Sequence, residues 1–370
     1  FTFYGIGGNP TGTSSGFAHY LLGNPDAKWE TTATTNIGVD AAFLNNTLSA
    51  TVDVWWRKTN DMLYPIAIPA VVGSVVAPSV NIGDMENKGF DLTIDYRNKA
   101  MGGDFTYGVG LVISHYKNEI VKLSSNANEF INGPDLRQMV YSRATVGTAY
   151  PEFYGLIVDG IFQSQAEADA YAPIYGGTYN QAGHFKFRDV DGNGVVDNED
   201  RTFIGSPHPK FTSGLNIDLG YKNLSLSAFF YASVGNKIVN YVKRWIDYSQ
   251  FNGNRSNAAR YDSWTPTNTG ASLPAFDANN VSQYPSTAFL EDGSFLRMKS
   301  LQLAYDLPRS FVNKLGLGNF QVYLMGSNLF TITKYEGLDP EISSSGMDLG
   351  QDQGAWPTVR RFMVGVKVDL

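Results

Sequence analysis

Cysteine is absent from the 370-residue chain, so neither a disulfide scaffold nor a thiolate zinc site can form. The 4 histidines are spread along the sequence, which argues against a histidine metal centre. Charged residues make up only 17%, and a net charge of −7 without any Lys/Arg-rich run offers no surface for a phosphate backbone. No segment approaches the roughly 18 to 20 consecutive apolar residues of a membrane-spanning helix. Helical spanning is therefore excluded, and nucleic acid is not an expected partner.

Sequence motifs of zinc and nucleotide chemistry are missing as well. No H-E-x-x-H and no G-x-x-x-x-G-K-[ST] pattern occurs. Six charged residues could be mistaken for catalytic groups: Glu291, Asp292, Arg297, Glu336, Asp339 and Glu341. Paired glycosidase carboxylates need a fixed separation across a cleft and a raised pKa on one of them. We therefore interpret these six as solvated loop charge and expect a protein that is not an enzyme.

Residues suited to strands and turns are abundant instead. Aromatic residues are 14% of the chain, with 21 Tyr and 23 Phe, and there are 38 Gly. Apolar and polar residues alternate over long runs; in the run 29–43, for example, Ile37 and Val39 alternate with Gly38 and Asp40. Successive side chains of a strand point to opposite faces, so such runs predict strands with one apolar and one polar face. The expected fold class is all-β.

Strand length and the connections favour an antiparallel transmembrane β-barrel. The runs extend for roughly 10 to 15 residues, about what a tilted strand needs to cross a bilayer. We expect eleven strands, at about 29–43, 48–58, 88–98, 104–116, 136–146, 150–160, 210–221, 223–233, 293–306, 319–330 and 358–370. Short turns are expected at 45–46, 98–103, 147–149 and 222–223, and long polar stretches at about 59–87, 118–135, 161–209, 235–289 and 331–356. Outer-membrane barrels alternate short periplasmic turns and long extracellular loops in this way.

The odd strand count indicates that the barrel is completed elsewhere. An antiparallel barrel closes on an even number, and an open edge in hydrocarbon would leave backbone groups without partners. The chain opens FTFYGIGG without an initiator Met or a signal peptide, so we expect a processed product or a fragment. A soluble β-sandwich or adhesin array is the alternative, because its strands also alternate. A β-propeller is disfavoured, since no repeat of about 40 to 50 residues is visible.

Five stretches carry a family resemblance. They are NIGDMENKGFDLTIDY (81–96), FYGLIVDGIFQSQAEADAY (153–171), RYDSWTPTNTGASLPAF (260–276), FLEDGSFLRMKSLQLAYDLP (289–308) and VYLMGSNLFTITKYEGLDPE (322–341). In this order they resemble the C-terminal half of SusC-like TonB-dependent outer-membrane transporters, the RagA/SusC family. The resemblance extends from about Trp29 to the last residue, and five co-linear motifs are far more specific than one.

That resemblance implies a 22-stranded barrel with an N-terminal plug, surrounded by lipid in a Gram-negative outer membrane of the Bacteroidetes type. It also implies import of oligosaccharides or oligopeptides, energised by TonB through an N-terminal region absent here and assisted by a SusD-like surface lipoprotein. Residues 1–28 would be an extracellular loop segment and residues 29–370 the C-terminal half of the barrel. The loops 235–289 and 331–356 would contact the lipoprotein. The alternative function is that of a passive adhesin or structural surface β-protein.

The segment FRDVDGNGVVDNEDR fits the spacing of a calcium loop. Positions 1, 3, 5, 7, 9 and 12 are taken by Asp189, Asp191, Asn193, the Val195 carbonyl, Asp197 and Asp200. Calcium prefers six to eight oxygen ligands, and Gly194 at position 6 permits the sharp turn. We expect a structural Ca²⁺ that braces an insertion at about 161–209. An Asx-rich solvated turn without an ion is the alternative.

Tryptophans suggest a second, weaker site. Strand alternation places Trp55 and Trp56 on opposite faces, so only one of them can face the lumen. In a barrel, outward tryptophans belong to the lipid-interface girdles. Trp264 and Trp356 lie in expected extracellular loops, and we therefore retain these two as candidate substrate- or partner-binding residues.

Overall fold

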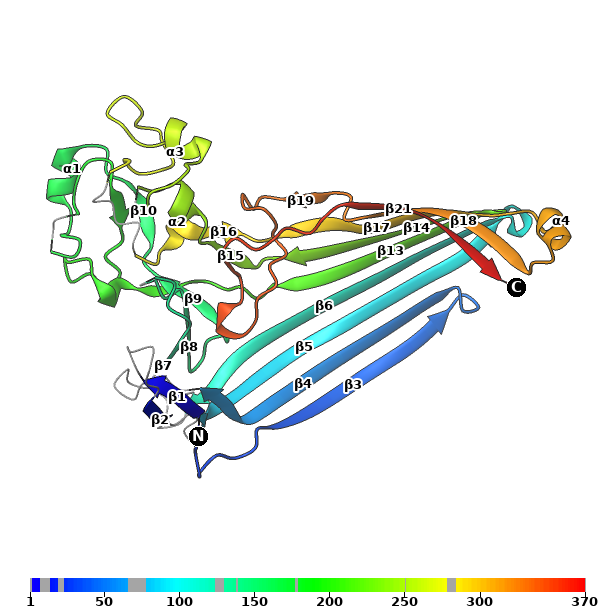
Figure 1. Cartoon of the computed structure of the whole chain (residues 1–370), viewed down its shortest axis with the longest axis horizontal. Helices are drawn as coiled ribbons and strands as arrows, with labels where there is room; N and C mark the ends of the chain where they lie inside the picture. Colours follow the sequence, from blue (N-terminus) through cyan, green and yellow to red (C-terminus); the bar gives the residue numbers. More distant parts are fainter. Residues whose placement is uncertain are drawn as a thin grey trace.

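Nine long antiparallel strands form one sheet in the computed structural model, which describes residues 2–6, 14–18, 23–65, 78–123, 130–137, 139–176, 179–249, 251–277 and 284–369 (Figure 1). Within these residues the strand order is β21-β18-β17-β14-β13-β6-β5-β4-β3, with β19 added beside β17. The strands are β3 (Thr31–Phe43), β4 (Leu48–Pro65), β5 (Ser79–Ala100), β6 (Phe105–Leu123), β13 (Phe211–Tyr221), β14 (Leu224–Val234), β17 (Phe295–Asp306), β18 (Asn319–Ser327), β19 (Thr331–Thr333) and β21 (Arg361–Asp369). The sheet bears out nine of the eleven antiparallel barrel strands that the sequence predicts.

The first hairpin shows how alternation sorts side chains between the two faces. β3 and β4 are joined at 44–47, where Asn45 and Asn46 have φ of 54° and 65°. Ile37 pairs with Val54, and both side chains are exposed on one face. On the opposite face Asn36 donates a hydrogen bond of 2.9 Å to Asp53. The hairpin predicted at this position is confirmed, with an apolar face and a hydrogen-bonded polar face.

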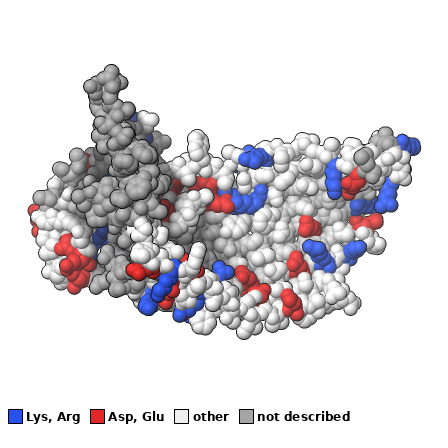
Figure 2. Space-filling view, turned by 60° about the horizontal axis from the view of Figure 1, so that its bottom comes forward, with Lys and Arg blue, Asp and Glu red and all other residues white. Residues whose placement is uncertain are grey.

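Connections at the two ends of the sheet differ in length (Figure 1). At one end the turns 44–47, 101–104 and 222–223 are short; the second contains η2 (Met101–Gly103), and the connection 307–318 contains α4 (Arg309–Val312) and η5 (Asn313–Leu315). At the other end lie the long connections 66–78, 124–210, 235–294 and 328–360. Figure 2 shows acidic and basic side chains scattered along the molecule, including the part that the long sheet occupies.

The long connections fold into a lobe of short elements. They are β7 (Phe130–Asn132), β8 (Ser142–Thr145), β9 (Glu152–Gly155), β10 (Val158–Ile161), α1 (Gln165–Ala170), β11 (Phe185–Phe187), η3 (Asn198–Asp200), β12 (Thr202–Gly205), β15 (Lys237–Asn240), α2 (Lys243–Ile246), α3 (Asn257–Tyr261), η4 (Thr287–Phe289), β16 (Leu290–Asp292), η6 (Gly346–Asp348) and β20 (Gln351–Asp352). Three small sheets result, with orders β12-β9-β8-β7, β10-β11 and β16-β15-β20. Strands β1 (Thr2–Ile6) and β2 (Ser14–Ala18) pair separately. Among the described residues, no helix has the length and apolarity to cross a membrane.

The lobe has a core shared by several connections. Tyr141 and Phe153 from the connection 124–210 are buried against Phe289 from the connection 235–294. The Gln351 amide donates to the Ser142 hydroxyl at 2.7 Å, which ties the connection 328–360 to β8. The loops are therefore one packed unit rather than independent excursions.

Two of the eleven expected barrel strands are wrong. The segments 136–146 and 150–160 do not join the long sheet; they contribute the short strands β8, β9 and β10 to the lobe. The strand at 136–146 was expected mainly from the parity of the strand count, and the structure instead buries Leu136, Met139, Tyr141, Ser142 and Ala144 inside the lobe. The chain between β6 and β13 is therefore one long connection, and none of its described strands joins the long sheet. The stretch 59–87 is also shorter as a loop than expected, because β4 extends to Pro65 and β5 starts at Ser79.

Candidate functional site

The acidic loop between β11 and β12 is built from side-chain-to-backbone hydrogen bonds. Asp189 accepts from the backbone N–H groups of Gly192 at 2.7 Å and Gly194 at 2.9 Å. Both glycines have positive φ, 74° and 84°, which allows the chain to wrap around the Asp189 carboxylate. Asp191 accepts from the backbone N–H of Asn193 at 2.9 Å, which forms the next turn of the same kind. The sequence DVDGNG therefore folds around its own first acidic residue.

The second half of the loop closes on a buried carboxylate. Asp200 is fully buried and accepts from the backbone N–H of Val190 at 2.6 Å and of Asp197 at 2.8 Å. Asp197 caps η3 by accepting from the backbone N–H of Glu199 at 2.8 Å. The first and last positions of the loop are thereby brought together.

Three of the predicted ligands converge. Oxygens of Asp189, Asp191 and Asp200 lie within 4.8 Å of one another, the only such group of three among the described residues. Asn193 lies at the rim: its Oδ1 accepts from the Val195 N–H at 2.8 Å, and its amide donates to Asp191 at 3.0 Å. A carboxylate or amide oxygen that accepts one hydrogen bond keeps a second lone pair. The hydrogen bonds from backbone N–H groups are therefore compatible with a bound cation.

Backbone N–H groups of the loop stabilise the negative charge of Asp189. Burial acts to raise the pKa of Asp189, but the amide bonds from Gly194 and Gly192 outweigh it and hold the pKa below its ordinary value. None of the three converging carboxylates forms an ion pair with a described Lys, Arg or His. Three ionised carboxylates so close to one another repel, and a hard divalent cation with oxygen ligands is the group that relieves this repulsion.

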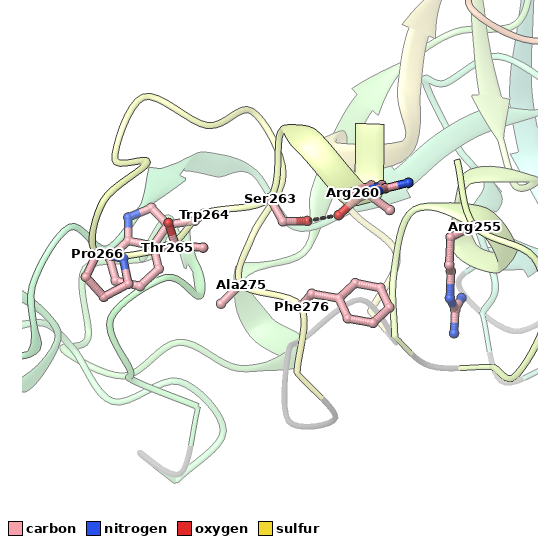
Figure 3. Close-up of a pocket in the computed structure, with 9 residues that line it drawn as sticks. Arg255, Arg260, Ser263, Trp264, Thr265, Pro266, Ala275 and Phe276 are labelled. Carbon is pink, nitrogen blue, oxygen red and sulfur yellow. Dashed lines mark hydrogen bonds between the residues drawn. The ribbon is translucent and has the colours of Figure 1, made fainter. Parts of the chain in front are cut away.

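Trp264 lines a cavity in the lobe (Figure 3). The cavity has a volume of about 670 Å³ and lies between α3 and the chain that follows it. Only 8% of Trp264 is exposed, because its indole N–H donates to Gln163 at 3.0 Å and its ring packs over Gly183. Trp264 therefore lines the cavity while most of its surface is covered by other residues.

The cavity combines apolar lining with two arginines. Phe276 and Arg255 form one side, with the Arg255 guanidinium carbon 5.1 Å from the centre of the Phe276 ring (Figure 3). Arg255 is fixed by donating to the carbonyls of Trp245 at 2.8 Å and Tyr248 at 2.6 Å. Arg260 on α3 also lines the cavity and is exposed. Such a pocket suits an apolar group that bears a negative charge.

Trp356 lies elsewhere. It follows β20 in the connection that leads to β21, and 97% of its surface is exposed. The structure therefore does not bring the two predicted tryptophans into one site. Trp55 and Trp56 do occupy opposite faces, as expected: Trp55 donates to Asp91 at 2.8 Å on the polar face, whereas Trp56 is exposed on the other.

Sequence reasoning missed a buried charge network. Arg297 and Asp339 are 2% and 7% exposed, so they are not solvated loop charges as expected. Arg297 pairs with Asp339 at 2.5 Å and with Glu341 at 2.6 Å, and Lys299 pairs with the same glutamate. The signal was available only as a compact set of opposite charges in the motifs 289–308 and 322–341, without any indication of burial.

Comparison with known proteins supplies the family. The model of the "TonB dependent receptor-like, beta-barrel" family matches residues 2–232. The chain belongs to this family. It is 36% identical over 358 residues to TonB-dependent receptor P3 of Formosa agariphila, covering 93% of this chain and 34% of that protein. It is 28% identical to TonB-dependent receptor SusC of Bacteroides thetaiotaomicron, covering 94% of this chain and 32% of that one.

A solved structure agrees with this assignment. "Structure of the RagAB peptide transporter" matches with a TM-score of 0.78 and 26% identity over all of this chain and 38% of that chain. The resemblance to the RagA/SusC family is thus confirmed, and the chain is an outer-membrane protein of the kind found in Bacteroidetes. It spans about a third of the length of these relatives.

Proposed function

We propose that this chain forms the barrel wall and extracellular lobe of a TonB-dependent importer of oligosaccharides or oligopeptides. The observation that carries the proposal is the long sheet with one apolar and one polar face, joined at one end to a packed lobe of the kind that matches the RagAB peptide transporter. A polar inner face suits a passage for hydrophilic cargo, and the lobe suits capture at its entrance. A passive adhesin is the competing function.

Uptake in the producing cell tests this proposal. Deletion of the gene should abolish growth on the cognate oligomer and its energised uptake, and disruption of TonB should have the same effect. Complementation with the intact gene serves as the control. Unimpaired uptake in the deletion strain, combined with loss of attachment to a surface, would identify an adhesin instead.

The partner is proposed to be a SusD-like lipoprotein that sits on the lobe. The expected contacts are the loops 235–289, described except for 250 and 278–283, and 331–356. Trp264 at its cavity and the exposed Trp356 are the candidate contact residues. Aromatic residues with large contact area often anchor protein interfaces. Co-purification with the lipoprotein should survive mild detergent in the wild type and weaken in the Trp356→Ala variant; equal recovery would argue against contact at Trp356.

A second proposal concerns the acidic loop: Asp189, Asp191 and Asp200 hold a structural Ca²⁺, with Asn193, the Val195 carbonyl and Asp197 completing the ligands. The convergence of the first three carboxylates supports it. Calcium would supply only charge neutralisation, while the loop residues provide the turn and the amide bonds. Even an affinity of about 10⁻⁴ to 10⁻³ M suffices in a calcium-containing external medium.

Protease protection tests the calcium proposal. The double substitution Asp189→Ala and Asp191→Ala should raise cleavage between 161 and 209 while the barrel persists, and chelation should do the same in the wild type. Asp169→Ala removes an exposed acid of the same lobe and should behave as wild type. If chelation leaves the loop equally protected, the loop is an Asx-rich turn that folds without an ion.

A further inference from the structure

The small sheet β12-β9-β8-β7 has one packed face and one open face. Ser142 and Ala144 of β8 and Phe153 of β9 are buried on the packed face. Alternation then places Arg143 and Tyr154 on the opposite, partly exposed face. This open face carries an arginine held in an unusual environment.

Arg143 is stacked between two aromatic rings. Its guanidinium carbon lies 3.9 Å from the centre of the Phe130 ring on β7 and 3.9 Å from that of the Tyr154 ring on β9. Its Nε donates to the Asn132 side-chain oxygen at 3.2 Å. Two rings and one hydrogen bond fix the plane of the guanidinium, so little side-chain entropy is left to lose when a ligand binds.

The two terminal nitrogens of the Arg143 guanidinium, which form its fork, keep free hydrogen-bond donors. No described residue accepts a hydrogen bond from its two terminal nitrogens, and Arg143 forms no ion pair. The strand register places Glu152 directly opposite Arg143, yet the two are not paired. Burial raises the pKa of Glu152, and its carboxyl is held by a backbone amide at Ala149. The nearest acid in the sheet is thus not the counter-ion of Arg143.

A second unpaired arginine lies next to the first. The Arg201 guanidinium carbon is 5.0 Å from the same Tyr154 ring, and its Nη2 donates to the carbonyls of Val140 at 2.9 Å and Tyr154 at 3.4 Å. Its Nε is buried and has no acceptor in the described part of the chain. Burial, together with the charge of Arg201, lowers the pKa of Arg143. Two cations are therefore kept close together without a compensating anion.

We propose that Arg143, with the positive charge of Arg201 near the same Tyr154 ring, forms a binding site for an oxyanion, a carboxylate, sulfate or phosphate group, carried by the imported oligomer. This assignment rests on the proposed import function. A planar guanidinium donates two parallel hydrogen bonds to such a group, and a fork fixed by stacking is already in the required orientation. The side-chain amide nitrogen of Asn132 has no acceptor among the described residues and adds a donor beside the fork. The cargo class is thus an acidic oligosaccharide or an acidic peptide.

Inorganic sulfate is the first probe. The complete protein is solubilised in detergent from the cells that produce it, and binding of radiolabelled sulfate is measured by equilibrium dialysis. Sulfate binding should be about tenfold weaker in the Arg143→Gln variant than in the wild type. Arg143→Lys keeps the charge but loses the fork, and should bind sulfate more weakly than the wild type. Arg188→Gln is the matched control, because Arg188 is an exposed arginine of the same lobe already paired with Asp159 at 2.6 Å. Equal sulfate binding by the wild type and Arg143→Gln would overturn the site.

Uptake then decides whether the cargo carries the anion. Cells receive length-matched pairs of uronate and neutral oligosaccharides, and of Glu-containing and Gln-containing peptides. Arg143→Gln should reduce uptake of the acidic member of the imported pair and spare the neutral one, while Arg188→Gln changes neither. Sulfate binding without any change in acidic uptake would overturn the cargo assignment in favour of a free anion or a lipid phosphate. Wild-type cells that import no probe, with sulfate still bound, would refute the import function and not the site.

Discussion

Arg297 on β17 and Asp339 in the connection to β21 form an ion pair of 2.5 Å that is closed off from solvent. Thr358 donates to the other oxygen of Asp339 through its hydroxyl at 2.6 Å and through its backbone N–H at 2.8 Å. Both ends of the segment 339–358 are thereby attached to one buried arginine, because Arg297 also donates to Thr358 at 2.7 Å. The pair acts as the anchor of the last long connection.

Replacing Arg297 should release this connection. Arg297→Met leaves Asp339 buried without a cation, and breaking a buried pair in this way costs about 3–5 kcal/mol. We expect faster proteolysis within 334–358 while the long sheet is retained. Lys299→Met is the control: its side chain is more exposed, and such pairs contribute only about 0–1 kcal/mol. Similar proteolysis of the two variants would contradict the anchor. The double variant Arg297→Met with Asp339→Leu should recover much of the protection.

Acid should loosen the same anchor. Burial acts to raise the pKa of Asp339, but the bonds from Arg297 and Thr358 outweigh it and lower the pKa to about 2. The unfolded value is about 3.9, so the stabilisation is fully present above that pH and is lost as the pH falls toward 2. Resistance of 334–358 to an acid-stable protease, assayed at each pH, should decline only below about pH 4. Loss of protection between pH 5 and 7 would point to a different group.

A charge on the apolar face of the sheet should prevent assembly. Val54 is exposed beside Ile37 on that face, and an arginine near the bilayer midplane costs about 2–4 kcal/mol. Val54→Arg is therefore expected to lower the fraction of protein that shows heat-modifiable mobility on a gel. Val54→Leu, which keeps the site apolar, should assemble normally. Unchanged mobility of Val54→Arg would mean that this face does not contact lipid.

Gly89 on β5 provides the space for Trp55. A Cβ at position 89 would lie 2.5 Å from the Trp55 ring and would also meet the carbonyl of His115. Gly89→Ala should displace the indole from Asp91 and cost about 1–3 kcal/mol by overpacking. The measurement is the tryptophan emission maximum together with the melting temperature. Gly270→Ala is the matched control, because no atom lies near its Cβ position; equal behaviour of the two variants would contradict the role of Gly89.

Alternation predicted the long strands because their two faces meet different surroundings over the whole strand. Ile37, Val39, Val52 and Val54 fall on one exposed face for this reason. The strand expected at 136–146 rested mainly on the parity of the strand count and was wrong: Ala144 is buried against Met347, which comes from the distant connection 328–360. Local pattern cannot distinguish a residue that faces lipid from one that packs against a distant loop. The sequence therefore predicts the barrel strands better than the lobe.

The spacing of acidic residues predicted the acidic loop because the contacts of this loop are local in the sequence. Asp189, Asp191 and Asp200 converge because eleven intervening steps of tight turn bring the first and last positions together. Burial of Trp264 depends instead on Gln163, about a hundred residues earlier, and nothing near Trp264 reveals it. The arginine stack was missed on the same grounds, since Phe130, Arg143 and Tyr154 meet only when β7, β8 and β9 pair.

The packed lobe has a consequence for the order of folding. Its core joins Tyr141 to Phe289, and its hydrogen bonds join Ser142 to Gln351, so most of the chain lies between residues in contact. Contacts of such long sequence separation carry a large loop-closure entropy and form late unless other structure brings their ends together. The long sheet does this, because it collects the roots of every long connection at one end. The barrel wall is thus the template on which the lobe assembles. A substitution that disrupts the wall therefore delays folding of the lobe even where no lobe residue has changed.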